Sequence, residues 1–308
     1  MKEKNKVNEL DIAKIKSEKP IKELIEFGII NVDKPSGWTS FDVVNHIRMK
    51  LGLTKCGHFG TLDPNVTGVL PICLEKTCKI QDLFMHHDKI YVGKMIFHKE
   101  IEEKKIKEAI KKFIGKINQL PPRKSRVKRV VREREVKKFE ITNFDKEKRE
   151  VSFVAEVEAG TYIRKLCSDL AESLGVGGQM TELRRIKAGL FSIQDKEFSS
   201  IEEIDKIIEE YKSGSKEGKE KLRKLIIPAE IITKLIKNIV VDKKWIDKLS
   251  HGSPIFDEML DNFKEDKKII FTKELFGVIS NNKLIEIAKF SDKFEQKSIL
   301  AKPESVLV

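Results

Sequence analysis

The chain has 308 residues and a formal net charge of +12, from 61 Lys and Arg against 49 Asp and Glu. This length suggests about two domains, and the sequence holds no apolar run of the ~20 residues that a membrane span requires. The basic balance favours a polyanionic partner such as RNA or DNA, although a solvated Lys/Glu surface is also typical of thermophilic proteins. The four cysteines form no CxxC pair, which favours a reduced, cytoplasmic protein.

The N-terminal residues are charged throughout and lack the apolar stretch of a signal peptide. They predict a flexible basic arm over residues 1–19. After a short helix, GIINVDKPSGWTS (28–40) is typical of an apolar strand followed by a Pro-Gly turn. Ser40 or Thr39 can cap the next helix, which Gly52 ends.

Residues 57–71, GHFGTLDPNVTGVLP, place one carboxylate, that of Asp63, between three glycines. Glycine permits positive φ and close approach of a ligand, and Pro64 favours an extended conformation for Asp63. The segment therefore predicts a rigid loop that presents one acid. From this loop alone, an Asx turn is the alternative. Cys56 and His58 could supply half of a metal site, but no second pair at zinc spacing follows, so no metal is expected.

Strand and helix patterns alternate after this loop. VLPICL predicts a strand, EKTCKIQDLF a helix, KIYVGKMIF (89–97) a strand and IEEKKIKEAIKKFIG (101–115) an amphipathic helix. VKKFEITNF and REVSFVAEVEAG predict an antiparallel pair, and TYIRKLCSDLAESLGVG (161–177) predicts a helix. The short runs NIVVD, KIIFT, LFGVIS and LIEIAKF predict a small β-barrel-like domain over residues 236–308.

A basic segment, PPRKSRVKRVVREREVKK (121–138), carries nine Lys or Arg against two Glu. Its interleaved valines predict an ordered strand or ribbon, whose cations can follow a phosphate backbone. A solvated edge strand guarded by charge is the alternative. We favour RNA or DNA binding. The candidate contacts are Arg123, Lys124, Arg126, Lys128 and Arg129.

Five collinear motifs resemble the TruB/dyskerin family of RNA pseudouridine synthases: INVDKPSGWTS, GHFGTLDPNVTGVLP, KIYVGK, GTYIRKLC and MTELRRIKAGLF. The resemblance runs from about residue 20 to the C-terminus. IKELIEFGIINVDKP, QLPPRKSRVKRVVREREV and VGGQMTELRR resemble the archaeal and eukaryotic dyskerin-type branch. The segment from HG at 251–252 to the final AKPESVLV is similar to a PUA domain. Phe59, Trp38 and Phe41 replace residues that are more usual in the family.

The resemblance implies an α+β fold. A pseudouridine synthase domain over residues 20–235, with a mixed, mostly antiparallel sheet and flanking helices, would precede a β-barrel PUA domain over residues 236–308. It implies an isomerase of the tRNA pseudouridine synthase B type, which flips a uridine out of RNA and exchanges its glycosidic bond without a cofactor. The substrate would be the TΨC-loop uridine of tRNA (position 55), ribosomal RNA uridines chosen by guide RNA in a box H/ACA particle, or both. RNA and small box H/ACA subunits would be the partners.

The same resemblance assigns the site. Asp63 would be the nucleophile, Arg164 its charged partner, and Tyr91 the ring that stacks on the flipped uracil. The residues around the substrate would be His58, Tyr162 and Leu183. Each of these residues, taken alone, has an ordinary structural explanation, such as core packing or a surface ion pair.

Two other functions fit parts of the pattern. An aspartyl-phosphate phosphotransferase would also use an exposed Asp, but no DxD or other magnesium-binding partner lies near Asp63 in the sequence. A non-catalytic RNA-binding module is the other alternative, and the joint presence of Asp63, Tyr91 and Arg164 argues against it. We therefore favour the synthase.

Overall fold

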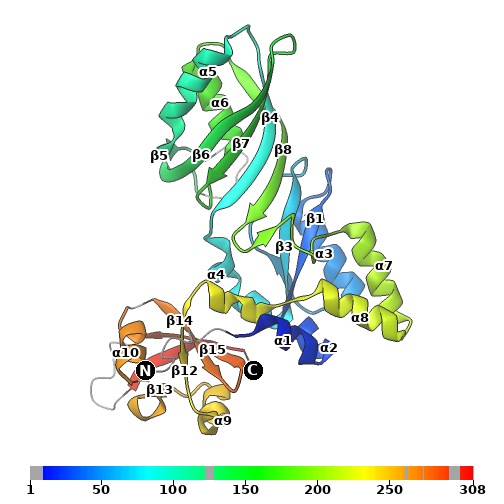
Figure 1. Ribbon diagram of the computed structural model, residues 1–308, viewed down its shortest axis with the longest axis vertical. Coiled ribbons are helices and arrows are strands. Elements are labelled where there is room, and N and C mark those ends of the chain that lie inside the picture. Colours follow the sequence, from blue (N-terminus) through cyan, green and yellow to red (C-terminus); the bar gives the residue numbers. More distant parts are fainter. Residues whose placement is uncertain (1–9, 122–127, 261–262, 273, 291–298, 308) are drawn as a thin grey trace, which may run out of the picture.

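Two sheets with flanking helices organise the chain (Figure 1). The computed structural model describes residues 10–121, 128–260, 263–272, 274–290 and 299–307. The strands of the larger sheet are β1 (Gly28–Lys34), β2 (Cys56–His58), β3 (Thr67–Leu74), β4 (Lys89–Phe97), β5 (Gly115–Gln119), β6 (Arg132–Asp145), β7 (Glu150–Val157), β8 (Gly178–Ala188), β9 (Phe191–Ser192), β10 (Ser199–Ser200) and β11 (Ile227–Pro228).

The larger sheet runs in the order β10-β1-β3-β8-β4-β7-β6-β5. In the described residues, its parallel pairs are β1–β10 and β3–β8, and its other pairs are antiparallel, which confirms the predicted mixed, mostly antiparallel sheet. The β3–β8 pairing is short, with Thr67 opposite Arg184 and Gly68 opposite Arg185. The sheet therefore has two halves that meet immediately after the Asp63 loop.

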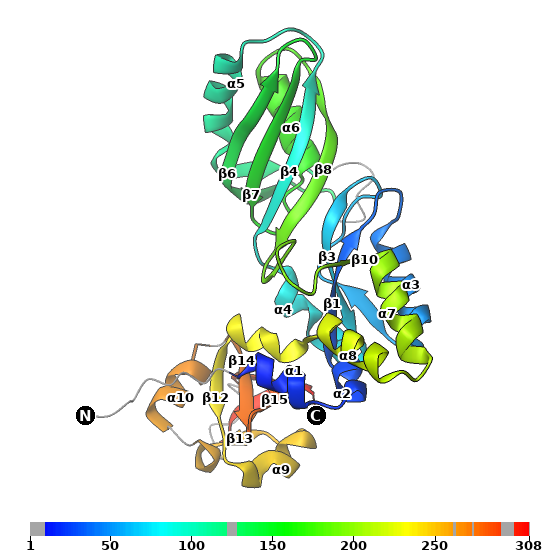
Figure 2. The ribbon, with the colours of Figure 1, turned by 45° about the vertical axis from the view of Figure 1, so that its right-hand side comes forward.

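Helices cover both halves of this sheet. In Figures 1 and 2, α5 and α6 lie against the half that contains β4 to β8, and α3 and α7 lie beside the half that contains β1 and β3. The core contains the buried side chains of Phe97, Phe153 and Leu166.

The helices that precede the smaller sheet are α1 (Ile12–Glu18), α2 (Ile21–Glu26), α3 (Ser40–Leu51), α4 (Gln81–Met85), α5 (Glu103–Ile110), α6 (Ile163–Ser173), α7 (Ile201–Lys212) and α8 (Lys216–Leu225). The 3-10 helices are η1 (Glu75–Ile80), η2 (Lys111–Phe113), η3 (Ala229–Lys234), η4 (Lys243–Trp245) and η5 (Asp257–Met259). No helix in the described ranges is long and apolar enough to cross a membrane.

The caps of α3 follow the sequence prediction. Thr39, one of the two candidates, accepts a hydrogen bond from the backbone N–H of Asp42, whose carboxylate accepts one from the Thr39 N–H in return. Gly52 ends the helix in the left-handed conformation, with φ of 69°. This reciprocal cap fixes the point at which the DKPSGWTS turn enters the helix.

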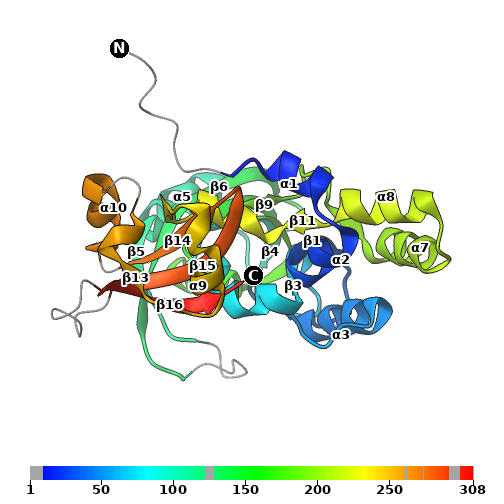
Figure 3. The same ribbon diagram turned by 90° about the horizontal axis from the view of Figure 1, so that it is seen from below.

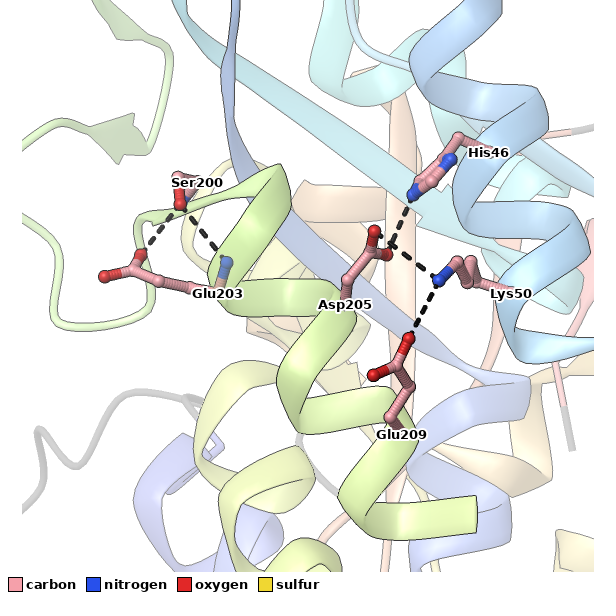
Figure 4. Close-up of polar contacts among 6 residues, drawn as sticks. All are labelled: His46, Lys50, Ser200, Glu203, Asp205 and Glu209. Atoms are coloured by element: carbon pink, nitrogen blue, oxygen red, sulfur yellow. Dashed lines mark hydrogen bonds and ion pairs between the residues drawn. The ribbon is translucent and has the colours of Figure 1, made fainter.

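Polar contacts join α3 to α7 (Figure 4). The Nε2 atom of His46 lies 2.8 Å from Oδ1 of Asp205, and Nζ of Lys50 lies 3.2 Å from Oε1 of Glu209. Ser200 caps the start of α7 by accepting a hydrogen bond from a backbone N–H of its first turn. The exposed Lys50–Glu209 pair adds little stability, and the partly buried His46–Asp205 contact fixes α3 against α7.

Helix α1 corrects the prediction of a flexible arm over residues 1–19. Leu10 and Ile15 are buried in an apolar cluster, and Nη1 of Arg223 donates a hydrogen bond of 2.8 Å to the carbonyl oxygen of Lys16. The prediction is therefore wrong for residues 10–19. Apolar residues at helical spacing lie between the charges, and their burial decides the structure of this segment.

The smaller sheet has its own core and curls at one end of the molecule (Figure 1). Its strands are β12 (Lys237–Val240), β13 (Ile255–Phe256), β14 (Leu275–Ser280), β15 (Lys283–Phe290) and β16 (Ile299–Val306), with the helices α9 (Ile246–Ser250) and α10 (Phe263–Ile270). The prediction that KIIFT is a strand is wrong, because Lys268 to Ile270 belong to α10. Burial of Asp266 and Ile270, one helical turn apart, overrides the strand propensity of these residues.

One apolar cluster joins the smaller sheet to the rest of the chain. Ile279 and Ile287 of the smaller sheet share this cluster with Phe27 and Ile29 and with Ile15 of α1. Seen from below, the smaller sheet lies beside α1 and α2 (Figure 3). The N-terminal helix thus packs where the two sheets meet.

Candidate active site

Asp63 and Arg164 form an ion pair where the two halves of the larger sheet meet. Nη2 of Arg164 lies 2.9 Å from Oδ2 of Asp63. Asp63 comes from the loop between β2 and β3, and Arg164 from the first turn of α6. About half of each side chain is exposed, 50% for Asp63 and 53% for Arg164, so a ligand can reach the pair. The Asp63 carboxylate is paired with Arg164. This favours the prediction of a loop that exposes the acid over the alternative of an Asx turn.

The buried ammonium group of Lys34 fixes the backbone beside Asp63. Its Nζ atom donates hydrogen bonds of 2.8 Å to the carbonyl oxygens of Pro35 and Pro64. Lys34 is fully buried, and burial lowers its pKa, while the nearby carboxylates of Asp42 and Asp63 raise it. Hydrogen bonds from a charged donor are strong, so Lys34 ties β1 to the residue that follows the acid.

A second set of bonds fixes the residue that precedes Asp63. The backbone N–H of Leu62 donates to Oγ of Ser40 over 2.8 Å, and this hydroxyl donates to the Leu62 carbonyl oxygen over 3.1 Å. The N–H of Gly37 donates to the carbonyl oxygen of Pro64 over 3.0 Å. The start of α3 and the Pro-Gly turn therefore hold the loop on the two sides of the acid.

Arg185 holds the two glycine-containing ends of the loop. Its side chain is 1% exposed; Nε donates to the carbonyl oxygen of Val69 over 2.8 Å, and Nη2 donates to that of Gly60 over 3.0 Å. Gly68 has φ of 99°, and a Cβ atom there would lie 2.2 Å from the Arg185 carbonyl oxygen. No other residue fits at Gly68 without displacing β8. These contacts support the predicted rigid loop.

His58, at the end of β2, is held in a neutral form. The N–H of Gly60 donates to Nδ1 of His58 over 3.2 Å, which assigns the ring hydrogen to Nε2. Burial, and then the positive charge of Arg185, lowers the pKa of His58. The ring is therefore uncharged at neutral pH and carries a donor at Nε2.

Tyr91 and Leu183 lie on neighbouring strands, β4 and β8. Both belong to or pack against the main core, and Tyr91 is 7% exposed. Tyr91 lies opposite Arg185 in the β4–β8 ladder, and Leu183 lies opposite Gly93. Leu183 therefore lies on the strand that carries Arg185, and Tyr91 lies on the strand next to it. The contacts of Tyr91 and Leu183 with a base stay predictions.

Tyr162 immediately precedes α6 and is held by Gln119, a residue that sequence analysis missed. The Tyr162 N–H donates to Oε1 of Gln119 over 2.9 Å, and Nε2 of Gln119 donates to the Tyr162 carbonyl oxygen over 3.2 Å. Gln119 is 2% exposed. This reciprocal pair fixes the start of α6, and therefore the position of Arg164.

The basic segment begins beside this pair. Gln119, at the end of β5, lies opposite Arg132, the first residue of β6. Lys128 and Arg129 are exposed and precede β6, so the predicted strand extends over only the later part of residues 121–138. Three of the predicted contacts, Arg123, Lys124 and Arg126, lie outside the described residues.

Three of the residues that hold the Asp63 loop lie in motifs that the sequence analysis identified, but their roles could not be predicted from those motifs. Lys34 and Ser40 lie in INVDKPSGWTS, and Arg185 lies in MTELRRIKAGLF, but neither motif shows which backbone carbonyl its residues bind. Gln119 stands outside the five motifs, and only its contact with Tyr162, across 43 positions, reveals its role.

Comparisons with known proteins give the class of this chain. Residues 48–163 match the family model described as TruB family pseudouridylate synthase (N terminal domain), and residues 164–234 match the tRNA pseudouridylate synthase B C-terminal domain. A probable tRNA pseudouridine synthase B of Methanocaldococcus jannaschii is 38% identical over 78% of this chain and 69% of its own length. Another, from Sulfurisphaera tokodaii, is 36% identical over 94% of this chain and 85% of its own length.

Solved structures agree over nearly the whole chain. A chain of a Cbf5-Nop10-Gar1 complex superposes with a TM-score of 0.81 and 32% identity, over 95% of this chain and 88% of that chain. A chain of an H/ACA RNP bound to a substrate RNA gives 0.79 and 31%, over 95% and 89%. The fold and these matches define an enzyme that isomerises uridine in RNA. The chain belongs to the TruB family of pseudouridylate synthases.

Proposed function

We propose that Asp63 is the catalytic carboxylate of this synthase and that Arg164 binds and orients it. The observation that carries this proposal is their 2.9 Å ion pair, half exposed, on a loop whose backbone is fixed by Lys34, Ser40 and Arg185. Such support holds a reacting group in one geometry, which lowers the entropic part of an activation barrier. Around the pair we assign Tyr91, His58, Tyr162 and Leu183 to the flipped nucleotide.

The reaction is an isomerisation, so its atoms balance without a co-substrate. The bond between N1 of uracil and C1′ of ribose breaks, the base rotates, and C5 bonds to C1′. The hydrogen on C5 leaves as a proton to solvent, and N1 takes up a proton in its place. A carboxylate can bond to C1′ or stabilise positive charge there, as it does in glycoside chemistry. Arg164 keeps the Asp63 carboxylate oriented in either case.

We propose that residues 236–308 form an RNA-binding PUA domain beside a catalytic domain that ends at residue 235. The smaller sheet has a separate core, and the family models end at residue 234. Nζ of Lys244 and of Lys248 lie 5.1 and 4.9 Å from the ring centroid of Trp245. A basic surface with an aromatic ring suits RNA.

The substrates and partners that we propose are those named for the relatives. The compared archaeal proteins are named tRNA pseudouridine synthase B, and the similar solved chains occur with Nop10, Gar1 and substrate RNA. We propose that this chain acts on the TΨC-loop uridine of tRNA and, with guide RNA and small box H/ACA subunits, on ribosomal RNA. The cytoplasmic location stays a prediction.

A comparison of two substrates tests this assignment. We expect the isolated chain to form pseudouridine in a tRNA transcript. We expect it to act poorly on a ribosomal RNA fragment until a guide RNA and the Nop10 and Gar1 subunits are added. The measurement is pseudouridine per RNA molecule over time, with Asp63→Asn as the blank. Rapid, guide-independent modification of the ribosomal fragment would contradict the assignment.

The exposed residues at the end of the basic segment give a second prediction. If Lys128 and Arg129 contact phosphates, replacing both with Gln makes the negative slope of log affinity against log salt shallower, by about 0.7 to 0.9 for each lost contact. Affinity for tRNA is measured between low and moderate salt. Lys219→Gln, an exposed change on α8, is the control and leaves the slope unchanged. An unchanged slope in the double variant assigns the segment to a solvated edge.

A further inference from the structure

Two thiols lie in near contact at the end of β3, the strand that follows the Asp63 loop. Sγ of Cys73, on β3, is 3.5 Å from Sγ of Cys78, in η1. Cys73 is fully buried, and Cys78 is partly exposed. Both cysteines are free thiols in this structure, and the mechanism above uses neither.

We propose that Cys73 and Cys78 are a redox-sensitive thiol pair, which a peroxide oxidises reversibly to a disulfide and thereby slows pseudouridine formation. The 3.5 Å separation and the unequal exposure of the two sulfur atoms support this proposal. A disulfide requires the two sulfur atoms to approach to about 2.05 Å, so the closure involves a displacement of about 1.5 Å.

Cys78 is the thiol that meets the oxidant. Solvent reaches it, and its hydrogen bond with Cys73 lowers the pKa of Cys78 and so favours the reactive thiolate. The same hydrogen bond, followed by burial, raises the pKa of Cys73. Burial raises the pKa of the nearby Cys56 to about 12, and burial also raises the pKa of Cys167, so these thiols stay protonated and do not make the first attack on peroxide.

The proposed chemistry balances with hydrogen peroxide as the oxidant. The Cys78 thiolate attacks one peroxide oxygen, the O–O bond breaks, and hydroxide leaves, which gives a sulfenic acid on Cys78. The Cys73 sulfur then attacks the Cys78 sulfur; the S–S bond forms and the S–O bond breaks. Hydroxide leaves and takes the Cys73 proton as water. Two thiols lose two electrons in total, and the peroxide gains them.

Closure of the disulfide strains the segment that carries His58. Cys73 is fixed because β3 pairs it with Ile29 of β1 and with Gly57 of β2. A Cβ atom on Gly57 would lie 2.9 Å from the Cys73 Sγ and 3.9 Å from the Cys78 Sγ, so the side of Gly57 that lacks a side chain faces both sulfur atoms. Closure of the disulfide changes this packing, and in our proposal Gly57 and the adjacent His58 shift with it. Displacements of about 1 Å at a catalytic site can cost about a hundredfold in rate.

The experiment treats the full-length reduced protein with hydrogen peroxide and then alkylates the remaining thiols. We expect peptide mass spectrometry to recover Cys73 and Cys78 in one disulfide, with Cys56 and Cys167 alkylated. Turnover on tRNA is expected to fall about tenfold or more, and dithiothreitol should restore it. Tight binding of tRNA should persist, because the basic residues are unaffected.

Matched variants separate this pair from other oxidation. Reduced Cys78→Ser is expected to turn over like the wild type and to resist peroxide, whereas Cys56→Ser stays sensitive. Peroxide treatment that leaves Cys73 and Cys78 separately alkylated overturns the proposal. Inhibition of Cys78→Ser equal to that of the wild type also overturns it, as does a disulfide that leaves turnover unchanged. The disulfide map does not depend on the assigned catalytic residues, so it separates the two hypotheses.

Discussion

Asp63→Asn is expected to lower the rate of pseudouridine formation by about 10⁴- to 10⁶-fold, the range seen when a reacting group is removed from a coupled site. Asparagine keeps the size and shape of the side chain but has no charge and is a poor nucleophile. The loop should persist, because Lys34 and Ser40 bind backbone atoms on either side of the acid. The loss therefore lies in the chemical step.

Binding of RNA distinguishes this loss from misfolding. We expect the Asp63→Asn variant to bind tRNA as tightly as the wild type or slightly more tightly, because the change removes a negative charge from a protein that binds a polyanion. Single-turnover rates and dissociation constants are measured on the same preparation. Asp82→Asn, an exposed change on α4, is the control and keeps the wild-type rate. Loss of RNA affinity in step with loss of rate would assign Asp63 to binding.

Glu286→Gln is expected to remove a large pH dependence of stability. Glu286 lies on β15, and in the described part of the chain both of its carboxylate oxygens are buried without a hydrogen-bond partner. Burial raises the pKa of this carboxyl to about 8, against 4.5 when it is exposed. The folded protein therefore keeps the proton over a range in which the unfolded chain releases it.

Proton linkage gives the direction in which Glu286 changes the stability with pH. Between about pH 4.5 and about pH 8 the folded state binds one more proton than the unfolded state at this site, so stability falls as pH rises. The loss approaches 1.4 kcal/mol for each pH unit, about the free energy of one pKa unit. Below this window the contribution of Glu286 to stability does not change with pH, and above it the loss is complete.

Urea unfolding at several pH values measures this effect. We expect the free energy of unfolding of the wild type to fall from pH 5 to pH 8 more steeply than that of Glu286→Gln, by about 1 kcal/mol for each pH unit. Glu304→Gln, an exposed change on the neighbouring strand β16, should keep the wild-type slope. Equal slopes for the wild type and Glu286→Gln would show that a polar group or water compensates the buried acid.

Local patterns in the sequence were sufficient for most elements, whereas the central pair required the family resemblance. The alternation in KIYVGKMIF and the helix signals at Thr39 and Gly52 depend on residues close in sequence, and the structure confirms them. Asp63 and Arg164 were brought together by the family resemblance, and their ion pair is present. Spacing alone could not have joined residues a hundred positions apart.

The errors and omissions depend on contacts between distant segments. Residues 10–19 were predicted as a flexible arm because most of them are charged or polar. Leu10 and Ile15 pack against apolar residues elsewhere in the chain. Arg185 and Gln119 were given no role because their partners are backbone groups on other elements. A sequence pattern reports side-chain character, whereas these roles depend on where a carbonyl or an amide points.

Release of tritium from RNA labelled at C5 of uridine tests whether this protein forms pseudouridine through Asp63. Formation of the C5–C1′ bond requires loss of the C5 hydrogen, so we expect one tritium to be released for each pseudouridine that the wild-type protein forms on tRNA. Asp63→Asn should release almost none over the same time while it binds the RNA. Wild-type protein that binds this RNA without releasing tritium, or an Asp63→Asn variant that releases it at a comparable rate, would contradict the account.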